Sequence, residues 1–180
     1  MFSRKFGVVV AVNIAMVVSP VIGGVAFAQV ASVATAQSLQ GVISTAARTA
    51  AAQSGFQALA ADAKTAAIVT SVSNALSLSG ASSEVIADAL IQAVADGTIS
   101  AGVALSVAAA VAPDMAAKIA AAPAVVAQLS RTGQSATVTA STNAAGGVSV
   151  LVGLTGAGGG GGGTAAYDPC AGVIAAYCGG

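Results

Sequence analysis

The sequence predicts a mainly α-helical chain: an alanine-rich bundle of short helices, then a β-hairpin, a flexible glycine-rich tether and a small disulfide-bearing C-terminal motif. Three observations support this: alanine with sparse larger apolar residues at helical spacing up to residue 133, β-branched residues between 137 and 154, and consecutive glycines at 158–163. Alanine favours helices, β-branched residues favour strands, and glycine runs resist ordering. We expect five segments: 1–28, 29–133, 134–155, 156–166 and 167–180.

The first 28 residues are predicted to be a secretory signal peptide. Arg4 and Lys5 precede an apolar run, and the small-residue triplet Ala26-Phe27-Ala28 follows it. This order of a basic, an apolar and a small-residue region is typical of secretory signals. We expect cleavage between Ala28 and Gln29, which would export the mature chain to the periplasm, the cell surface or the medium.

An uncleaved membrane anchor is the alternative, because the stretch from Phe6 to Phe27 approaches the roughly 20 residues of a transmembrane helix. Pro20 and Gly23-Gly24 would break such a helix and favour cleavage. Cleavage leaves four basic and six acidic residues, a net charge of −2. We therefore expect no nucleic-acid partner, and no transmembrane span in the mature chain, whose longest uncharged apolar stretch is 99–112.

Residues 29–133 are predicted to form a series of short helices. Larger apolar residues recur every three or four positions in two segments between Ala31 and Leu78, with a break near Ser54-Gly55. A third helix, Ser83 to Asp96, has an apolar face opposite an acidic one, and Gly97 ends it. Three shorter helices follow, starting at Thr98-Ile99-Ser100, at Pro113-Asp114 and at Pro123, with the last ending at Gly133.

Two β-branched segments flank a turn-rich segment and predict a hairpin within 134–155. The strands are expected at 137–141 and 148–154, and the turn at 143–147. A lone hairpin is marginal in water, so the second strand must pack on the helices or pair its edge with another chain. One face of that strand carries Val148, Val150, Val152 and Leu154.

The C-terminal motif contains both cysteines and both tyrosines of the chain. In an exported protein, a disulfide between Cys170 and Cys178 is the first expectation, with interchain crosslinks as the alternative. Asp168-Pro169 is typical of a helix start, but an unbroken helix would hold the cysteines about 12 Å apart, too far for a disulfide. We therefore expect a short closed loop. Tyr167 and Tyr177 either present contacts to a partner or fold back to cap the helices.

The composition excludes several classes of catalytic site. The chain has no His, which rules out Ser-His-Asp and Cys-His nucleophiles and His-based zinc sites. The acidic residues do not match the spacing of a calcium loop, and the glycine run lacks the Lys and Ser or Thr of a phosphate-binding loop. We therefore predict no enzyme activity, no catalytic or metal-binding residue and no cofactor.

The sequence therefore predicts a secreted or periplasmic, non-enzymatic structural or interaction protein of a bacterial-type cell envelope. It would act by self-association or by docking on an envelope protein, with residues 148–154 as the pairing edge and the C-terminal motif as a contact. A membrane-active secreted protein is one alternative, because the Ala- and Gly-rich composition and terminal loop look like those of certain bacteriocins. A periplasmic binding module for an apolar ligand held between the helices is another.

Overall fold

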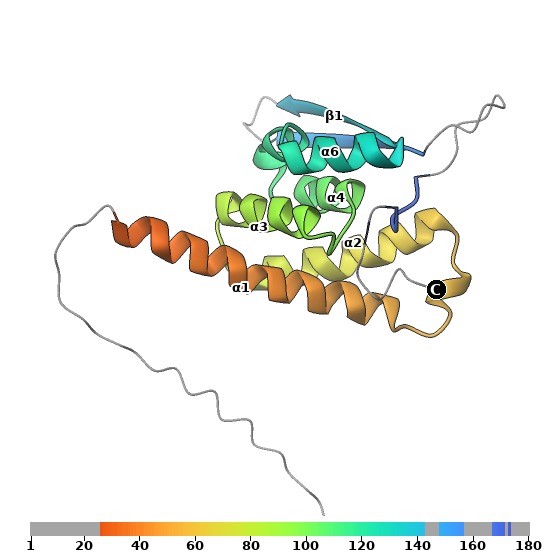
Figure 1. Ribbon diagram of the computed structural model, residues 1–180, viewed down its shortest axis with the longest axis horizontal. Coiled ribbons are helices and arrows are strands. Elements are labelled where there is room, and N and C mark those ends of the chain that lie inside the picture. Colours follow the sequence, from red (N-terminus) through yellow and green to blue (C-terminus); the bar gives the residue numbers. More distant parts are fainter. Residues whose placement is uncertain (1–25, 143–147, 157–166, 172, 174–180) are drawn as a thin grey trace, which may run out of the picture.

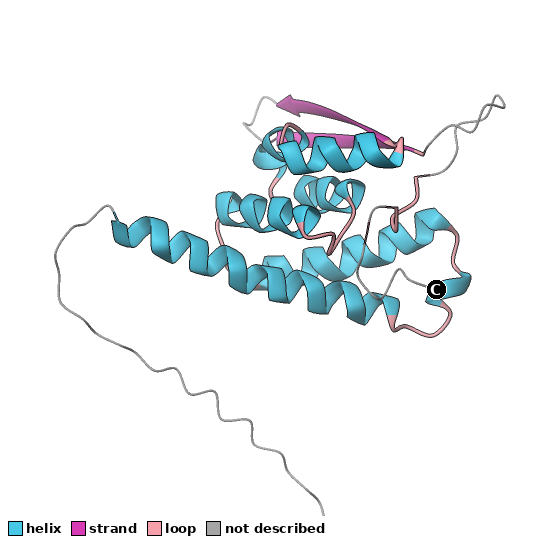
Figure 2. Cartoon of the chain, viewed as in Figure 1, coloured by secondary structure: helices cyan, strands magenta, loops and turns pink. Residues whose placement is uncertain are grey.

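The computed structural model describes residues 26–142, 148–156, 167–171 and 173. Within these ranges the chain is helical up to Thr132 and continues into a two-stranded antiparallel hairpin (Figures 1 and 2). The predicted fold class, mainly α with helices before a hairpin, is confirmed. Most of the predicted signal segment, the turn at 143–147, the glycine run and Cys178 lie outside the described residues.

The first layer consists of two long helices that pack along each other, α1 (Ala26–Ala51) and α2 (Ala61–Leu78) (Figure 1). The chain turns between them at Gly55, whose φ of 86° is in the left-handed region that favours glycine, and at the short helix η1 (Phe56–Ala58). The predicted break near Ser54-Gly55 is confirmed. Helix α1 begins before the predicted cleavage position, so cleavage after Ala28 would remove its first three residues.

Four shorter helices follow: α3 (Ser83–Ala95), α4 (Ala101–Val111), α5 (Ala116–Ala120) and α6 (Pro123–Thr132), with the 3-10 turn η2 (Pro113–Met115) before α5. Local capping sets their ends. The Ser82 hydroxyl accepts a hydrogen bond from the Val85 N–H at 3.5 Å, and Gly97 and Gly133 follow α3 and α6 at positive φ.

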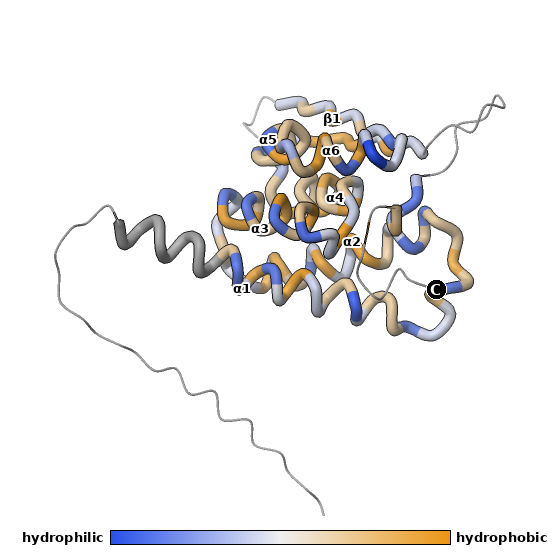
Figure 3. The backbone as a smooth tube through the Cα atoms, viewed as in Figure 1, coloured by the Kyte–Doolittle hydropathy of each residue, from blue (hydrophilic) through white to orange (hydrophobic). Residues whose placement is uncertain are grey.

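Helix α4 lies at the centre of the core. It contacts α2, α3, α5, α6 and the hairpin, and seven of its eleven residues are buried. Figures 1 and 3 show α3 and α4 in a middle layer rich in hydrophobic positions, between the α1–α2 pair and the layer of α6 and the hairpin. The buried side chains are mostly Ala, Val, Leu and Ile. Small Ala side chains let the helix axes approach closely, so a helix surrounded on several sides still fits.

The hairpin consists of β1 (Ser135–Thr142) and β2 (Val148–Thr155), paired one to one over eight positions from Ser135 opposite Thr155 to Thr142 opposite Val148. Burial alternates along β2, and the four residues predicted to share one face, Val148, Val150, Val152 and Leu154, are all half-buried. Val150 and Val152 pack against the helical core.

No helix within the described ranges combines the length and the hydropathy that crossing a bilayer requires.

Candidate functional site

The C-terminal segment docks on the helical bundle. Tyr167 is only 3% exposed, and its hydroxyl oxygen accepts a hydrogen bond of 2.6 Å from the backbone N–H of Gly102 in α4. Pro169 is also buried, and Val173 packs against the core. Of the two alternatives for Tyr167, the structure shows the one in which the tyrosine folds back onto the helices. The other predicted contact, Tyr177, lies outside the described residues.

Three side chains complete the first turn of α4, where backbone N–H groups have no partner within the helix. The Ala101 N–H donates to Oε1 of Gln128 in α6, and the Gly102 N–H donates to the Tyr167 hydroxyl. The Val103 N–H lies 3.4 Å from Oγ of the capping residue Ser100. Because Ser100 and Gln128 are buried, water does not supply acceptors for these N–H groups. The acceptors come instead from the residue before α4, from α6 and from the C-terminal segment.

Gly102 is the residue that admits the tyrosine ring. A Cβ atom at this position would lie 2.3 Å from Cζ of Tyr167 and 2.6 Å from its Cε1. Such distances are far inside van der Waals contact, so the ring occupies the space of the missing side chain. We use the name α4 pocket for Gly102 together with the polar residues Ser100, Gln128 and Gln134, which bond to the first turn of α4 or to the segment docked on it. We use the name tail for residues 167–171 and 173.

Polar contacts hold the backbone of the tail as well. Gln134, which is 7% exposed, donates from Nε2 to the Asp168 carbonyl oxygen at 3.1 Å, and Thr132 Oγ1 lies 3.2 Å from Gln134 Oε1. The Cys170 N–H donates to Oδ1 of Asp168 at 2.9 Å, and the Ala171 N–H lies 3.2 Å from the Asp168 carbonyl. These bonds form a tight turn at the predicted helix start.

The predicted disulfide depends on a residue that the structure leaves out. No cysteine within the described part of the chain is free. Cys178 lies outside that part, so the pairing of Cys170 with Cys178 stays a prediction.

Burial raises the pKa of Tyr167 above its ordinary value, while hydrogen bonds with Ser100 and Gly102 lower it and the charge of Asp168 raises it. The neutral phenol is therefore the form that the α4 pocket holds. Because the folded pKa exceeds the unfolded value of about 10, this stabilisation is complete below pH 10 and is lost as the pH rises through the folded pKa.

Replacing Gln128 by leucine tests the role of its amide oxygen. Leucine keeps much of the volume but leaves the buried Ala101 N–H without its acceptor, so we expect Q128L to lower the free energy of unfolding by about 2 kcal/mol. Urea denaturation followed by circular dichroism measures the change. The matched control is Gln37→Leu on an exposed face of α1, where we expect a change within about 0.5 kcal/mol. Equal losses in both variants would contradict the role assigned to Gln128.

The hairpin is the second candidate site, because it presents an exposed face and unpaired edges. Leu151 is 73% exposed at the middle of β2, and Ser149 and Gly153 beside it are exposed too. Among the described residues the sheet has only these two strands, so each strand keeps one outer edge without a partner strand. Neither strand contains a charged residue or a proline.

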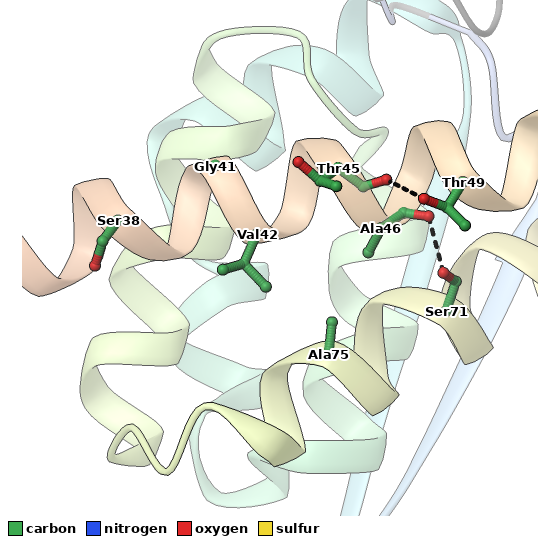
Figure 4. A pocket seen from close by; sticks show the side chains of 8 residues that line it. All are labelled: Ser38, Gly41, Val42, Thr45, Ala46, Thr49, Ser71 and Ala75. Carbon is green, nitrogen blue, oxygen red and sulfur yellow. Dashed lines mark hydrogen bonds between the residues drawn. The ribbon is translucent and has the colours of Figure 1, made fainter. Parts of the chain in front are cut away.

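An open groove of about 600 Å³ lies between α1 and α2 (Figure 4). Its lining is small and uncharged: Ser38, Gly41, Val42, Thr45, Ala46, Thr49, Ser71 and Ala75. Two of its hydroxyls are engaged within the protein, since Thr49 Oγ1 donates to the Thr45 carbonyl and Ser71 Oγ to the Ala46 carbonyl, each at 2.8 Å. For an apolar-ligand module of the predicted kind, this groove offers few polar groups with which to select a ligand.

The sequence singled out Tyr167 and one face of β2 as candidate contacts, but it did not single out Gly102, Gln128 or Gln134. A glycine inside a helix costs about 1 kcal/mol relative to alanine, so Gly102 signals a close approach by another group. No comparable local signal marks either glutamine.

No group of three or more potential metal ligands occurs among the residues that the structure describes.

No protein-family model, no curated protein and no solved structure matches this chain. The function is therefore inferred from the two candidate sites themselves. Of these, the α4 pocket is already filled by the chain's own tail. The hairpin, by contrast, has an outer edge on each strand that no other described strand pairs with.

Proposed function

We propose that this protein is an exported, non-enzymatic interaction protein of the cell envelope, whose copies associate through the outer edges of the hairpin. The observation that carries the proposal is the regular, uncharged ladder of β1 and β2 with its exposed outer face. The basic and apolar order of the first 28 residues supports export. No catalytic step is included, because the chain lacks His and the known nucleophile motifs.

Four features by which proteins protect sheet edges are absent from β1 and β2. Lysine, proline, β-bulges and very short strands normally prevent edge-to-edge pairing. Here eight consecutive pairs follow one register without a bulge, and neither strand contains lysine or proline. The edges therefore suit the addition of a strand by backbone hydrogen bonds.

A second copy of the same chain is the partner that fits these edges best. A strand that pairs with its own counterpart about a twofold axis forms an antiparallel ladder. Twofold symmetry is the commonest symmetry of soluble oligomers. Identical strands with no charge do not repel each other electrostatically. Joining two hairpins would also give a sheet of four strands, which is more stable than a sheet of two.

Leu151→Lys tests this association. Lysine at this exposed position leaves the inward face intact but places like charges near the edge of both copies, so we expect the dissociation constant to rise at least about tenfold. Light scattering after size-exclusion chromatography, over a range of protein concentrations, measures it. The matched control is Leu78→Lys, which makes the same charge change at a position 88% exposed at the end of α2.

We expect L78K to associate as the unchanged chain does. Circular dichroism of both variants confirms that the fold is retained. An unchanged chain that is monomeric at every concentration would contradict the proposal, and so would an L151K variant that associates as strongly as L78K.

A further inference from the structure

The geometry points to a second interaction site: the α4 pocket binds the tail of another copy in exchange for its own. The partner segment is the tail of a second chain, and its anchor is the phenol of Tyr167. This tail exchange uses neither the edges nor the outer face of the hairpin. It is therefore separable from the association proposed above, although an edge-paired dimer would promote it by bringing two pockets together.

The tail and its pocket belong to distant parts of the chain. Tyr167 bonds to Gly102, 65 positions earlier, and Gln134 bonds to Asp168, 34 positions later. These contacts do not depend on a direct covalent link between the two parts. A tail from a second copy can therefore make the same contacts without a new interface, which is why segment exchange is an inexpensive route to a dimer.

The reach of the chain permits the exchange. Eleven residue steps separate Gly156, at the end of the described hairpin, from Tyr167. At full extension they span at most about 40 Å, which is more than the diameter of a small domain. The glycines 158–163 lie between these residues, and the sequence predicts a flexible tether there.

The α4 pocket is selective for the segment that fills it. The absence of a Cβ at Gly102 fits a flat ring, and the Gly102 N–H requires an acceptor at the far end of that ring. Gln134 recognises the carbonyl that follows the tyrosine, and the buried Pro169 comes next. A phenol followed by a turn satisfies all of these features, so the partner must present a tail of this type.

Two complementary variants of the full chain test the exchange, with Tyr177→Phe added to both. The first carries Gly102→Ala, which blocks its own pocket and leaves Tyr167 as the sole tyrosine, exposed on a released tail. The second carries Tyr167→Ala, which empties its pocket and leaves the chain without tyrosine. We expect an excess of the second variant to slow the nitration of Tyr167 by tetranitromethane about tenfold. A tenfold lower rate means that about nine of every ten tails are bound and protected.

The matched control for the second variant is the chain with both Gly102→Ala and Tyr167→Ala, which has neither a usable pocket nor a tyrosine and should give no protection. Circular dichroism of each chain before mixing establishes that it is folded. If Tyr167→Ala unfolds the chain, Tyr167→Leu keeps more apolar contact and replaces it. Unchanged nitration with both chains folded would overturn tail exchange. Adding Leu151→Lys to both chains separates this result from edge pairing, because protection must persist in that background.

Discussion

Gly102→Ala releases the tail and lowers the free energy of unfolding by about 3 kcal/mol, as the sum of overpacking and a lost buried hydrogen bond. The added methyl group would lie 2.3 Å from Cζ of Tyr167, and the ring is too rigid to bend away. Either α4 shifts within its packed layer or the tyrosine leaves the pocket. Helix α4 is held by its contacts with α2, α3, α5, α6 and the hairpin, so the tail is the part that moves.

Once the tail leaves, the buried Gly102 N–H loses its acceptor and the packing of Pro169 and Val173 is lost as well. Urea denaturation measures the free energy, and ultraviolet absorption of Tyr167 in a Tyr177→Phe background reports its exposure before unfolding. We expect an exposed tyrosine in the folded variant, which a merely weakened helix would not produce.

Gly41→Ala is the matched control, because Gly41 lies in α1 with no atom within 4 Å of the position of an added Cβ. Alanine is the better helix former, so G41A should stabilise the chain by up to about 1 kcal/mol. Opposite signs at two helical glycines would confirm the role of Tyr167. Equal effects would show that helix propensity alone governs both positions.

The ends of the helices could be predicted because local residues determine them. Serines at the starts, prolines in first turns and glycines after the ends act through neighbours one to four positions away. Two starts differ from the prediction. At Pro113 a 3-10 turn precedes α5, which begins at Ala116. At α4 the sequence suggested a start within Thr98-Ile99-Ser100, and the helix begins at Ala101. Ser100 is the cap outside the helix, since its hydroxyl is the acceptor for the Val103 N–H.

The packing of the hairpin could be predicted only as a pair of alternatives. Alternation along β2 showed which residues share a face, but not whether that face meets the helices or another chain. The structure places Val150 and Val152 against the helical core. Edge pairing depends on the backbone groups of the strands, about which the alternation of side chains says nothing. The predicted edge pairing therefore stays a prediction.

The α4 pocket could not be assembled from the sequence, because its members lie far apart in the chain. Clustering of tyrosines and cysteines drew attention to the tail, but its receptor lies 65 positions earlier. Gln128 is 2% exposed, although glutamine in an amphipathic helix is normally a surface residue. Its burial is explained by the Ala101 N–H, which only the tertiary structure brings to it.

Leu105→Ala is expected to lower the free energy of unfolding by about 4 kcal/mol, towards the upper end of the usual range for buried leucines. Leu105 is fully buried and is the only leucine of α4. The cost of such a cavity depends on how far its walls can collapse, and alanine neighbours have no side-chain torsions with which to fill it. Leu78→Ala, at a position 88% exposed, is the matched control and should change stability by less than about 0.5 kcal/mol.

In L105A the tail should stay docked until the whole domain unfolds, because its contacts lie in the first turn of α4 and at Gln134. The exposure of Tyr167 and the loss of helix should then coincide in urea, as they do when a domain unfolds in one step. In G102A the same two signals should separate, since the tyrosine is exposed while the helices persist. Separate transitions in L105A would contradict this, because they would mean that the tail and the core around Leu105 are not one cooperative unit.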